Sequence, residues 1–434
     1  MTDLVAARAQ MAMSLAFHII FAMVGMAMPL LMVLAERRFL RHGDRLDRTL
    51  AQRWARGTAI MFAVGAVSGT ALSFELGLLW PTFMAFAGPI VGMPFSLEGF
   101  AFFLEAIFLG IYLYGWERVS PRAHLLAGVG VLLSGIASAA FVLCANAWMN
   151  TPTGFTRAAD GSLLSVDPYA AMFNPAALSE VLHMTMAAFA AVGFAVAGIH
   201  AYMLLRRPGD AFHRRALGLA LAVGGVFACL QPLSGDLAAK QVAEYQPVKL
   251  AAMEGHWDTG RDVPLRIGGW PDEVAEATHY SIDIPYGLSF LATFDPHAEI
   301  KGLKDFPVED RPPVAIVHIA FQIMVGCGMA MMAVAAIAGY LRLRGRDLAA
   351  QRWFLRLLVL CAPLGLIAVE AGWTVTEVGR QPWIVQGILR TQDAVTPMPH
   401  LVIPFATFSL LYLVLGITVI VLLTRKVFTA EADA

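Results

Sequence analysis

The stretch LEGFAFFLEAIFLGIYLYGW, residues 97–116, decides the fold class of this chain. At about 1.5 Å of rise per helical residue, it is long enough to cross the roughly 30 Å hydrocarbon core of a bilayer. Its only charged side chains are Glu98 and Glu105. The stretch therefore predicts a membrane-spanning helix from Ser96 to Trp116.

The composition of the whole chain agrees with this prediction. Of its 434 residues, 58% are hydrophobic and 15% are charged, and the mean hydropathy is +0.65. Soluble domains average roughly 45–50% apolar and about 25% charged residues, so these values exclude a soluble globule. Lysine and arginine total 31 against 32 acidic residues, so no net field favours nucleic acid as a partner.

Nine stretches are long and apolar enough to span a membrane, which predicts an all-α polytopic membrane protein with one long extracytoplasmic loop. They are Met11–Ala35, Arg56–Leu79, Ser96–Trp116, His124–Met149, Ala177–Leu205, Ala216–Pro232, Pro313–Leu341, Trp353–Val375 and Pro399–Leu423. The first runs on without a small-residue cleavage pattern, so we expect a spanning helix there and not a removed leader.

The orientation follows from the basic residues in the connections between the spans. Eighteen lysines and arginines lie in the odd-numbered loops and the C-terminal tail, against three in the even-numbered short loops. Because cytoplasmic loops carry the excess of positive charge, we expect the N-terminus outside and the C-terminus in the cytoplasm.

The long polar loop, residues 233–312, faces outward in this arrangement. Its mixture of Trp, Tyr, Pro and charged residues, as in EGHWDT at 254–259 and GGWPDE at 268–273, indicates an ordered binding segment and not a flexible tether. The predicted segments are helices one to six at 1–232, the loop at 233–312, helices seven to nine at 313–425 and a cytoplasmic tail at 426–434.

Several titratable side chains lie inside the predicted spans, where each costs several kcal/mol and suggests a function. Glu98 and Glu105 are seven residues apart, which places both carboxylates on one helix face. His18, His183 and Glu377 lie with Glu98 in the outer half of the bilayer. Taken alone, each histidine has the alternative interpretation of a hydrogen-bonded helix contact.

Met324 lies nearer the middle of the seventh span and, taken alone, would be a packing residue. No HExxH or Cys/His set that would favour zinc is found. Imidazole, thioether and carboxylate groups on separate helices suit heme better, because His and Met are common axial ligands of heme iron.

With these residues in place, the chain resembles subunit I of cytochrome bd-type quinol oxidases, respiratory enzymes that oxidise quinol and reduce dioxygen to water. The resemblance covers nearly the whole chain. Beside residues 97–116 it rests on LSFELG at 72–77, ANAWMNTPTG at 145–154, QPVKLAAMEG at 246–255, FQIMVGCGM at 321–329 and GWTVTEVGRQPW at 372–383.

The resemblance implies a set of heme ligands. His183 and Met324 would be the two axial ligands of a low-spin heme b. His18 and Glu377 would bind two high-spin hemes, of which one is a heme b and the other a heme d or a third heme b. Which of His18 and Glu377 binds which high-spin heme is left open.

The resemblance also implies the proton and quinol residues. Lys249 and Glu254 correspond to the quinol site in the outward loop. Glu98 and Glu105 correspond to carboxylates beside the high-spin hemes, with Glu105 on the proton path from the cytoplasm. Ser138 and Asn146, which share a helix face, are expected in the same polar network.

Two further residues are expected to contact the hemes, Trp373 by packing and Arg380 by pairing with a propionate. The chain departs from the family pattern in the seven-residue spacing of its paired glutamates, where eight is frequent. It also carries Gln322 in place of an arginine two residues before the methionine ligand. The sequence of residues 97–116 resembles that of the cyanide-insensitive branch of the family.

The expected partners are subunit II of the oxidase, a small single-helix subunit, quinol, dioxygen and membrane lipid, in the inner (cytoplasmic) membrane of a bacterium. The expected activity is electrogenic, a translocase that builds a proton gradient without pumping. The alternatives are a proton-coupled secondary transporter, which would explain Glu98 and Glu105 but not the histidine and methionine set, and a heme-free scaffold subunit.

Overall fold

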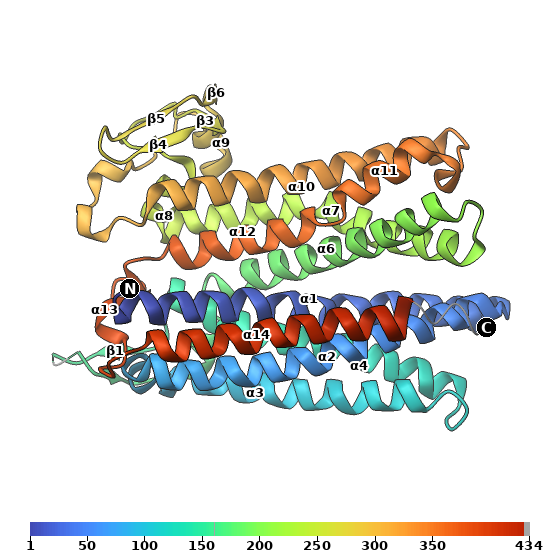
Figure 1. The fold of residues 1–434 in the computed structure, drawn as a ribbon. Coiled ribbons are helices and arrows are strands. Elements are labelled where there is room, and N and C mark those ends of the chain that lie inside the picture. Colours follow the sequence, from blue (N-terminus) through green and yellow to red (C-terminus); the bar gives the residue numbers. More distant parts are fainter. Residues whose placement is uncertain (160, 429–434) are drawn as a thin grey trace.

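A computed structural model of the chain describes residues 1–159 and 161–428. In this part of the chain nine helical spans are long and apolar enough to cross a membrane, as the sequence predicts (Figure 1). They are α1 Asp3–His42, α2 Arg45–Leu79, α3 Pro81–Tyr114, α4 Pro121–Asn150, α6 Ala177–Arg206, α7 Ala211–Tyr245, α10 Val314–Leu343, α11 Arg352–Cys361 together with α12 Leu364–Val378, and α14 Val402–Leu423. The predicted all-α polytopic membrane fold is confirmed.

The helix boundaries follow from capping residues. The Thr2 side chain accepts a hydrogen bond from the Val5 amide at the start of α1, and Gly43 ends that helix with φ 70°. Asp44 then caps α2 through the Leu46 amide. Such caps satisfy backbone groups that a helix end leaves unpaired, so α1 turns into α2 within two residues.

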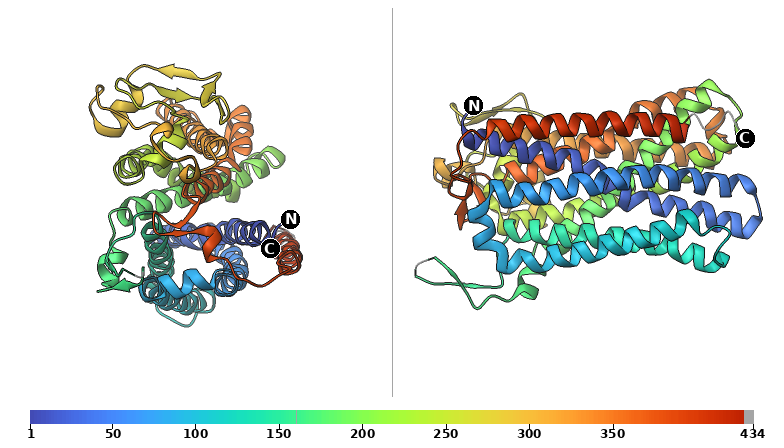
Figure 2. Two further views of the ribbon diagram at one scale, coloured as in Figure 1. Left: turned by 90° about the vertical axis from the view of Figure 1, so that its left-hand side faces the viewer. Right: turned by 60° about the horizontal axis from the view of Figure 1, so that its bottom comes forward.

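The spans form two groups. One contains α1–α4 and α14, and the other contains α6, α7, α10, α11 and α12 (Figure 2). In the second group, α6 packs on α7, α7 on α10, α10 on α12 and α12 on α6, so α6 and α10 lie across a four-helix ring from each other. At Gly193 and Gly224, α6 and α7 approach so closely that a Cβ on Gly193 would lie 2.5 Å from Gly224 backbone atoms.

Several spans differ from their predicted boundaries. The third was expected to begin at Ser96, but α3 begins at Pro81 and so includes the whole segment before it. The sixth and eighth spans differ as well. The sixth was expected to end at Pro232, but α7 continues past this proline to Tyr245. The residues around a proline inside a membrane helix can still find partners in neighbouring helices, so the helix need not end there. The eighth span divides at Ala362 and Pro363, because the proline lacks the amide hydrogen that would continue the helix.

Most of the small elements lie at one end of the bundle, which we call the loop end. It carries the N-terminus, and the C-terminal end of α14 lies at the opposite end (Figure 1). We call that opposite end the arginine end, after the basic residues in the turns that follow α1, α6 and α10. The assignment of these two ends to the outer and cytoplasmic sides is a prediction from the loop charges.

The long loop folds into a small layer over the second helix group. It contains α8 Pro247–Glu254, the strands β3 Leu265–Ile267, β4 Trp270–Asp272, β5 Ala277–His279 and β6 Ile282–Ile284, then α9 Gly287–Thr293, η1 Leu303–Asp305 and η2 Val308–Asp310. Strand β3 pairs with β6 and β4 with β5, both antiparallel. Leu250, Val263, Leu288 and Ile300 form a buried apolar cluster within this layer.

Two shorter connections complete the loop end. The strands β1 Thr156–Arg157 and β2 Leu163–Leu164 and helix α5 Pro168–Met172 join α4 to α6, and β7 Trp383–Val385, β8 Leu389–Arg390 and α13 Thr391–Ala394 join α12 to α14. At the arginine end, η3 Leu348–Ala350 precedes α11, and the chain passes after α14 into η4 Thr424–Phe428. Of the predicted tail 426–434, residues 429–434 lie outside the described part of the chain.

Candidate functional site

His18 is held by a serine on the neighbouring helix. Its Nδ1 lies 3.0 Å from Ser68 Oγ, and that hydroxyl donates its hydrogen to the Gly65 carbonyl at 3.1 Å. A hydroxyl carries one hydrogen, so the histidine Nδ1–H must be the donor to Ser68. The neutral ring therefore keeps the lone pair of Nε2 free to ligate a metal.

His183 is held in the same way. Its Nδ1 lies 3.2 Å from Ser234 Oγ, which donates to the Gln231 carbonyl at 2.9 Å. The lone pair again falls on Nε2, where the Gln231 amide nitrogen lies at 3.3 Å. Each of the two serines is followed by a glycine that faces the ring, and a Cβ on Gly69 would lie 2.9 Å from His18 Cε1.

Met324 lies on α10, across the four-helix ring from His183. Its sulfur faces Gly372 of α12, where an added Cβ would lie 3.0 Å from the sulfur atom. The diagonal position of α6 and α10 lets a flat group between them receive one ligand from each helix. This arrangement fits the predicted pair of axial ligands.

Glu377 lies near the loop end of α12 and accepts two short hydrogen bonds. Asn146 Nδ2 donates to its Oε1 and Arg380 Nη2 donates to its Oε2, both at 2.6 Å. Arg380 is 2% exposed. Asn146 was expected beside Glu98 and Glu105, whereas the structure brings it to Glu377.

A chain of polar side chains connects Glu377 to the long loop. Asn150 donates to Asn146 Oδ1 at 3.1 Å, and Lys249 Nζ donates to Asn150 Oδ1 at 2.8 Å. The Asn150 amide also lies 3.3 Å from Glu180 Oε1. Glu180 was not among the predicted site residues. Its position inside an apolar helix, one turn before His183, would have indicated a functional role.

Lys249 and Glu254 are buried, at 4% and 3% exposure, and do not lie on a solvated loop. Five helical residues correspond to about 500° of rotation, so the two side chains leave α8 about 140° apart. Lys249 points to Asn150 and Gly379, and Glu254 lies near Arg266. The structure therefore places them on different sides of α8.

Burial favours the neutral form of both groups, so it raises the pKa of Glu254 and lowers that of Lys249. It raises the pKa of Glu254 to about 7, with Arg266 offsetting part of the effect. The pKa of Lys249 is lowered by burial and by the positive charge of Arg380, against the attraction of Glu180 and Glu377. A carboxylate with a pKa near neutrality can accept and release a proton at physiological pH.

Gln322 of α10 forms hydrogen bonds to the long loop at strand β3. Its Oε1 accepts from the Gly268 amide at 2.9 Å, and its Nε2 donates to the Arg266 carbonyl at 3.0 Å. One turn earlier, His318 contacts the Met253 carbonyl through Nδ1 at 2.8 Å. The residue that departs from the family pattern therefore positions the loop beside Glu254.

Glu105 is 5% exposed and lies between α1 and α4. A Cβ on Gly25 would lie 3.4 Å from Glu105 Oε1, and one on Gly135 would lie 3.4 Å from the same carboxylate. Helices α1 and α3 run in the same direction, and His18 precedes Gly25 by the same seven residues by which Glu98 precedes Glu105. Glu98 therefore lies at about the depth of His18.

The residues present fit heme. Hemes carry propionate groups, which need buried donors, and the Nε and Nη1 of Arg380 and the Nε1 of Trp373 are buried donors without a protein partner. The two histidines present Nε2 lone pairs, as axial ligation requires. In the described part of the chain, no three His, Cys, Asp or Glu side chains could hold a metal ion among themselves.

Comparisons with known proteins agree with one another. Residues 6–430 match the family model described as cytochrome bd terminal oxidase subunit I. The structure of a bd oxidase from Geobacillus thermodenitrificans superimposes with a TM-score of 0.92 at 41% identity, over 98% of each chain.

Named relatives extend the likeness. A Bacillus subtilis (strain 168) chain provisionally named a cytochrome bd menaquinol oxidase subunit I is 38% identical over 98% of this chain and 96% of its own length. A second chain from that strain, a cytochrome bd ubiquinol oxidase subunit 1, is 33% identical over 98% of this chain and 94% of its own. The cytochrome bd-II ubiquinol oxidase subunit 1 of Escherichia coli (strain K12) is 30% identical over 89% and 88%.

Proposed function

The chain belongs to the cytochrome bd terminal oxidase subunit I family, and from this premise we propose that it is the heme-carrying subunit of a quinol:dioxygen oxidoreductase. The oxidase lies in the inner membrane of a bacterium, with the loop end of this subunit outside and its arginine end in the cytoplasm. Its partners are subunit II and a small single-helix subunit.

The observation that carries the proposal is the hydrogen-bonded chain from the buried Lys249 through Asn150 and Asn146 to Glu377. It joins the segment QPVKLAAMEG, where quinol is proposed to bind, to the segment GWTVTEVGRQPW, which holds a heme ligand. Four side chains from three helices are joined by successive hydrogen bonds, which a solvated charge on a loop would not form.

At the quinol site, Glu254 accepts a proton from a quinol oxygen. Lys249, on the other side of α8, begins the hydrogen-bonded chain that leads to Glu377. Glu254 suits this role because its pKa of about 7 lets it hold the proton and then release it toward the loop end. Arg266 assists because its positive charge stabilises the ionised form of Glu254 before the proton arrives.

Four side chains hold the hemes: His183 and Met324 one heme b, and His18 and Glu377 two further hemes, which are a b and a d or two of type b. When bound, the hemes carry electrons from quinol and supply the iron at which dioxygen is reduced to water. Trp373 and Arg380 offer buried donors to the propionates. The pairing of His18 and Glu377 with the two high-spin hemes stays open in this proposal.

Glu105 and Glu98 hold the protons that the reduction consumes. Glu105 lies two turns nearer the arginine end than Glu98, so protons taken from the cytoplasm reach Glu105 first. Release of protons at one face and uptake at the other separates charge without a pump.

The test of the quinol site is Glu254→Ala in the purified oxidase. We expect quinol oxidase turnover to fall about 100- to 10,000-fold, the usual contribution of a general base. The reduced-minus-oxidised spectrum should be unchanged, and pyridine hemochrome analysis should give the same heme content. Retained turnover would remove Glu254 from the mechanism, and absence of heme bands from the unmodified protein would refute the proposed function.

A further inference from the structure

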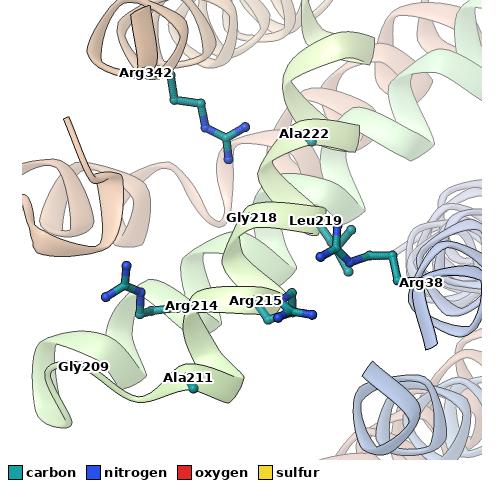
Figure 3. A pocket seen from close by; sticks show the side chains of 9 residues that line it. All are labelled: Arg38, Gly209, Ala211, Arg214, Arg215, Gly218, Leu219, Ala222 and Arg342. Atoms are coloured by element: carbon teal, nitrogen blue, oxygen red, sulfur yellow. The ribbon is translucent and has the colours of Figure 1, made fainter. Parts of the chain in front are cut away.

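A cavity of about 600 Å³ opens at the arginine end, between the two helix groups. Four arginines line it: Arg38 of α1, Arg214 and Arg215 of α7, and Arg342 of α10 (Figure 3). Its remaining lining residues are mostly small ones on α7, so the arginines supply the charge and the small residues leave space. The cavity lies outside the proposed heme and quinol sites.

The positive charge of the cavity is not fully neutralised. Arg215 pairs with Asp44 at 3.1 Å and Asp47 at 2.6 Å, and Arg214 pairs with Asp347 at 2.8 Å. Arg38 only approaches Asp47, at 3.6 Å.

Arg342 pairs with no carboxylate of the described residues. The Nε of Arg38 is buried and has no hydrogen-bond partner. Four guanidinium groups thus face three carboxylates. A smaller hollow of about 210 Å³ beside the cavity adds Arg346, which increases the excess of positive charge.

The shape of the cavity distinguishes a lipid from a small free anion. The lining residues of α7 run from Ala211, at the helix start, to Ala222. Eleven residues span about 16 Å along a helix, so the cavity continues well past the first turn into the apolar part of the bundle. Leu219 and Ala222 line this inner part, and Gly218 leaves space opposite Arg342, with a Cβ there 3.8 Å from Arg342 Nη2.

We propose that this cavity binds the phosphodiester headgroup of an anionic phospholipid. The arginines, led by Arg342, hold the phosphate, and the start of an acyl chain lies along Gly218, Leu219 and Ala222. Guanidinium groups suit phosphate because their parallel N–H donors match its oxygens. Basic pockets between membrane helices at this depth are typical sites for anionic headgroups.

Native mass spectrometry of the detergent-solubilised oxidase tests the proposal. Phosphatidylglycerol, phosphatidylcholine or inorganic phosphate is added to the unmodified protein, to Arg342→Gln and to Gly218→Phe. Arg342→Gln removes the unpaired charge, and Gly218→Phe fills the cavity with no change of charge. The control is Arg344→Gln, two residues along, whose guanidinium stacks on Tyr340 outside the cavity.

We expect phosphatidylglycerol adducts on the unmodified protein and on the Arg344→Gln control. Affinity should fall roughly fivefold in Arg342→Gln, the loss for one basic residue at a membrane surface, and adducts should disappear in Gly218→Phe. An unchanged elution profile and heme spectrum show that the variants fold.

Four results would overturn the proposal. The first is equal phosphatidylglycerol binding in all variants, and the second is equal binding of phosphatidylcholine. The third is displacement of the lipid by an equal concentration of inorganic phosphate, which would make the cavity a site for free anions. Loss of a bound small polypeptide instead of lipid in Gly218→Phe would likewise assign the cavity to a protein partner.

Discussion

The two helix groups present a histidine by the same means but surround it differently. In both, a serine on the next helix donates to the carbonyl three residues before it and accepts from the histidine Nδ1. Around His183 the helix across the ring contributes the sulfur of Met324. In the group that holds His18, the helix across from α1 is α3, which carries the carboxylates Glu98 and Glu105.

The ligand alone does not set the chemistry of such a site. Both histidines are held with the hydrogen on Nδ1, and the groups around each ring differ. A thioether that completes the coordination of an iron leaves no position for dioxygen and suits electron transfer. In the proposed function, the carboxylates of α3 supply the protons that dioxygen reduction requires. If the two regions work independently, a change in one should leave the other unaffected.

The largest effect is expected from removing each histidine. His183→Ala should abolish the absorption bands of the low-spin heme b and leave those of the high-spin hemes, because in the proposed function His183 and Met324 hold one heme only. His18→Ala should abolish the bands of one of the two high-spin hemes and leave those of the low-spin heme b. Each should lower turnover more than about a hundredfold, above the loss for an outer-shell partner. An unchanged low-spin signal in His183→Ala would refute the ligand assignment.

The next effect separates the acids of the two regions. Glu105→Gln should slow reoxidation of the reduced enzyme by dioxygen about 100-fold or more, because the buried amide cannot deliver a proton. Reduction by quinol, followed by stopped-flow absorption, should stay normal. Glu117→Gln, an exposed residue just beyond the same helix, is the control. Slowed quinol reduction in Glu105→Gln would contradict the division between the regions.

A smaller effect is expected from the two serines. Ser68→Ala and Ser234→Ala remove the partner that fixes the histidine tautomer, and each should weaken retention of its own heme by about 10- to 100-fold. Heme loss to apomyoglobin measures this. Ser73→Ala, whose exposed hydroxyl bonds only its own helix, should change nothing. Equal heme loss from both regions in either single variant would show that the sites are coupled.

The smallest effect concerns pH. Glu254 must be ionised to accept a proton, so turnover should rise as pH increases through about 7, its pKa. Arg266 lowers this pKa, so Arg266→Gln should move the rise to higher pH by less than about one unit. Arg261→Gln, an exposed change in the same loop, should leave the profile in place. A shift to lower pH in Arg266→Gln would contradict the assignment of Glu254 as the base.

The nine spans could be predicted because apolar length alone dictates a membrane helix. The buried environment of Lys249 could not, since it depends on α8 folding back onto Asn150 and Gly379, residues far away in the sequence. Gln322 looked like the loss of a charge, and only the strand layer reveals its two backbone hydrogen bonds. Burial and pairing arise from tertiary contacts that no local pattern encodes.

The break between α11 and α12 has a consequence for how such proteins can diversify. The short helix α12 carries Trp373 and Glu377, while α11 anchors the arginine end independently of it. Because Pro363 interrupts the backbone hydrogen bonding, changes that retune α12 for a different heme need not be transmitted to α11. Residues 364–378 thus form a separate helical segment, whose tilt can adjust to what Glu377 binds without a matching change in α11.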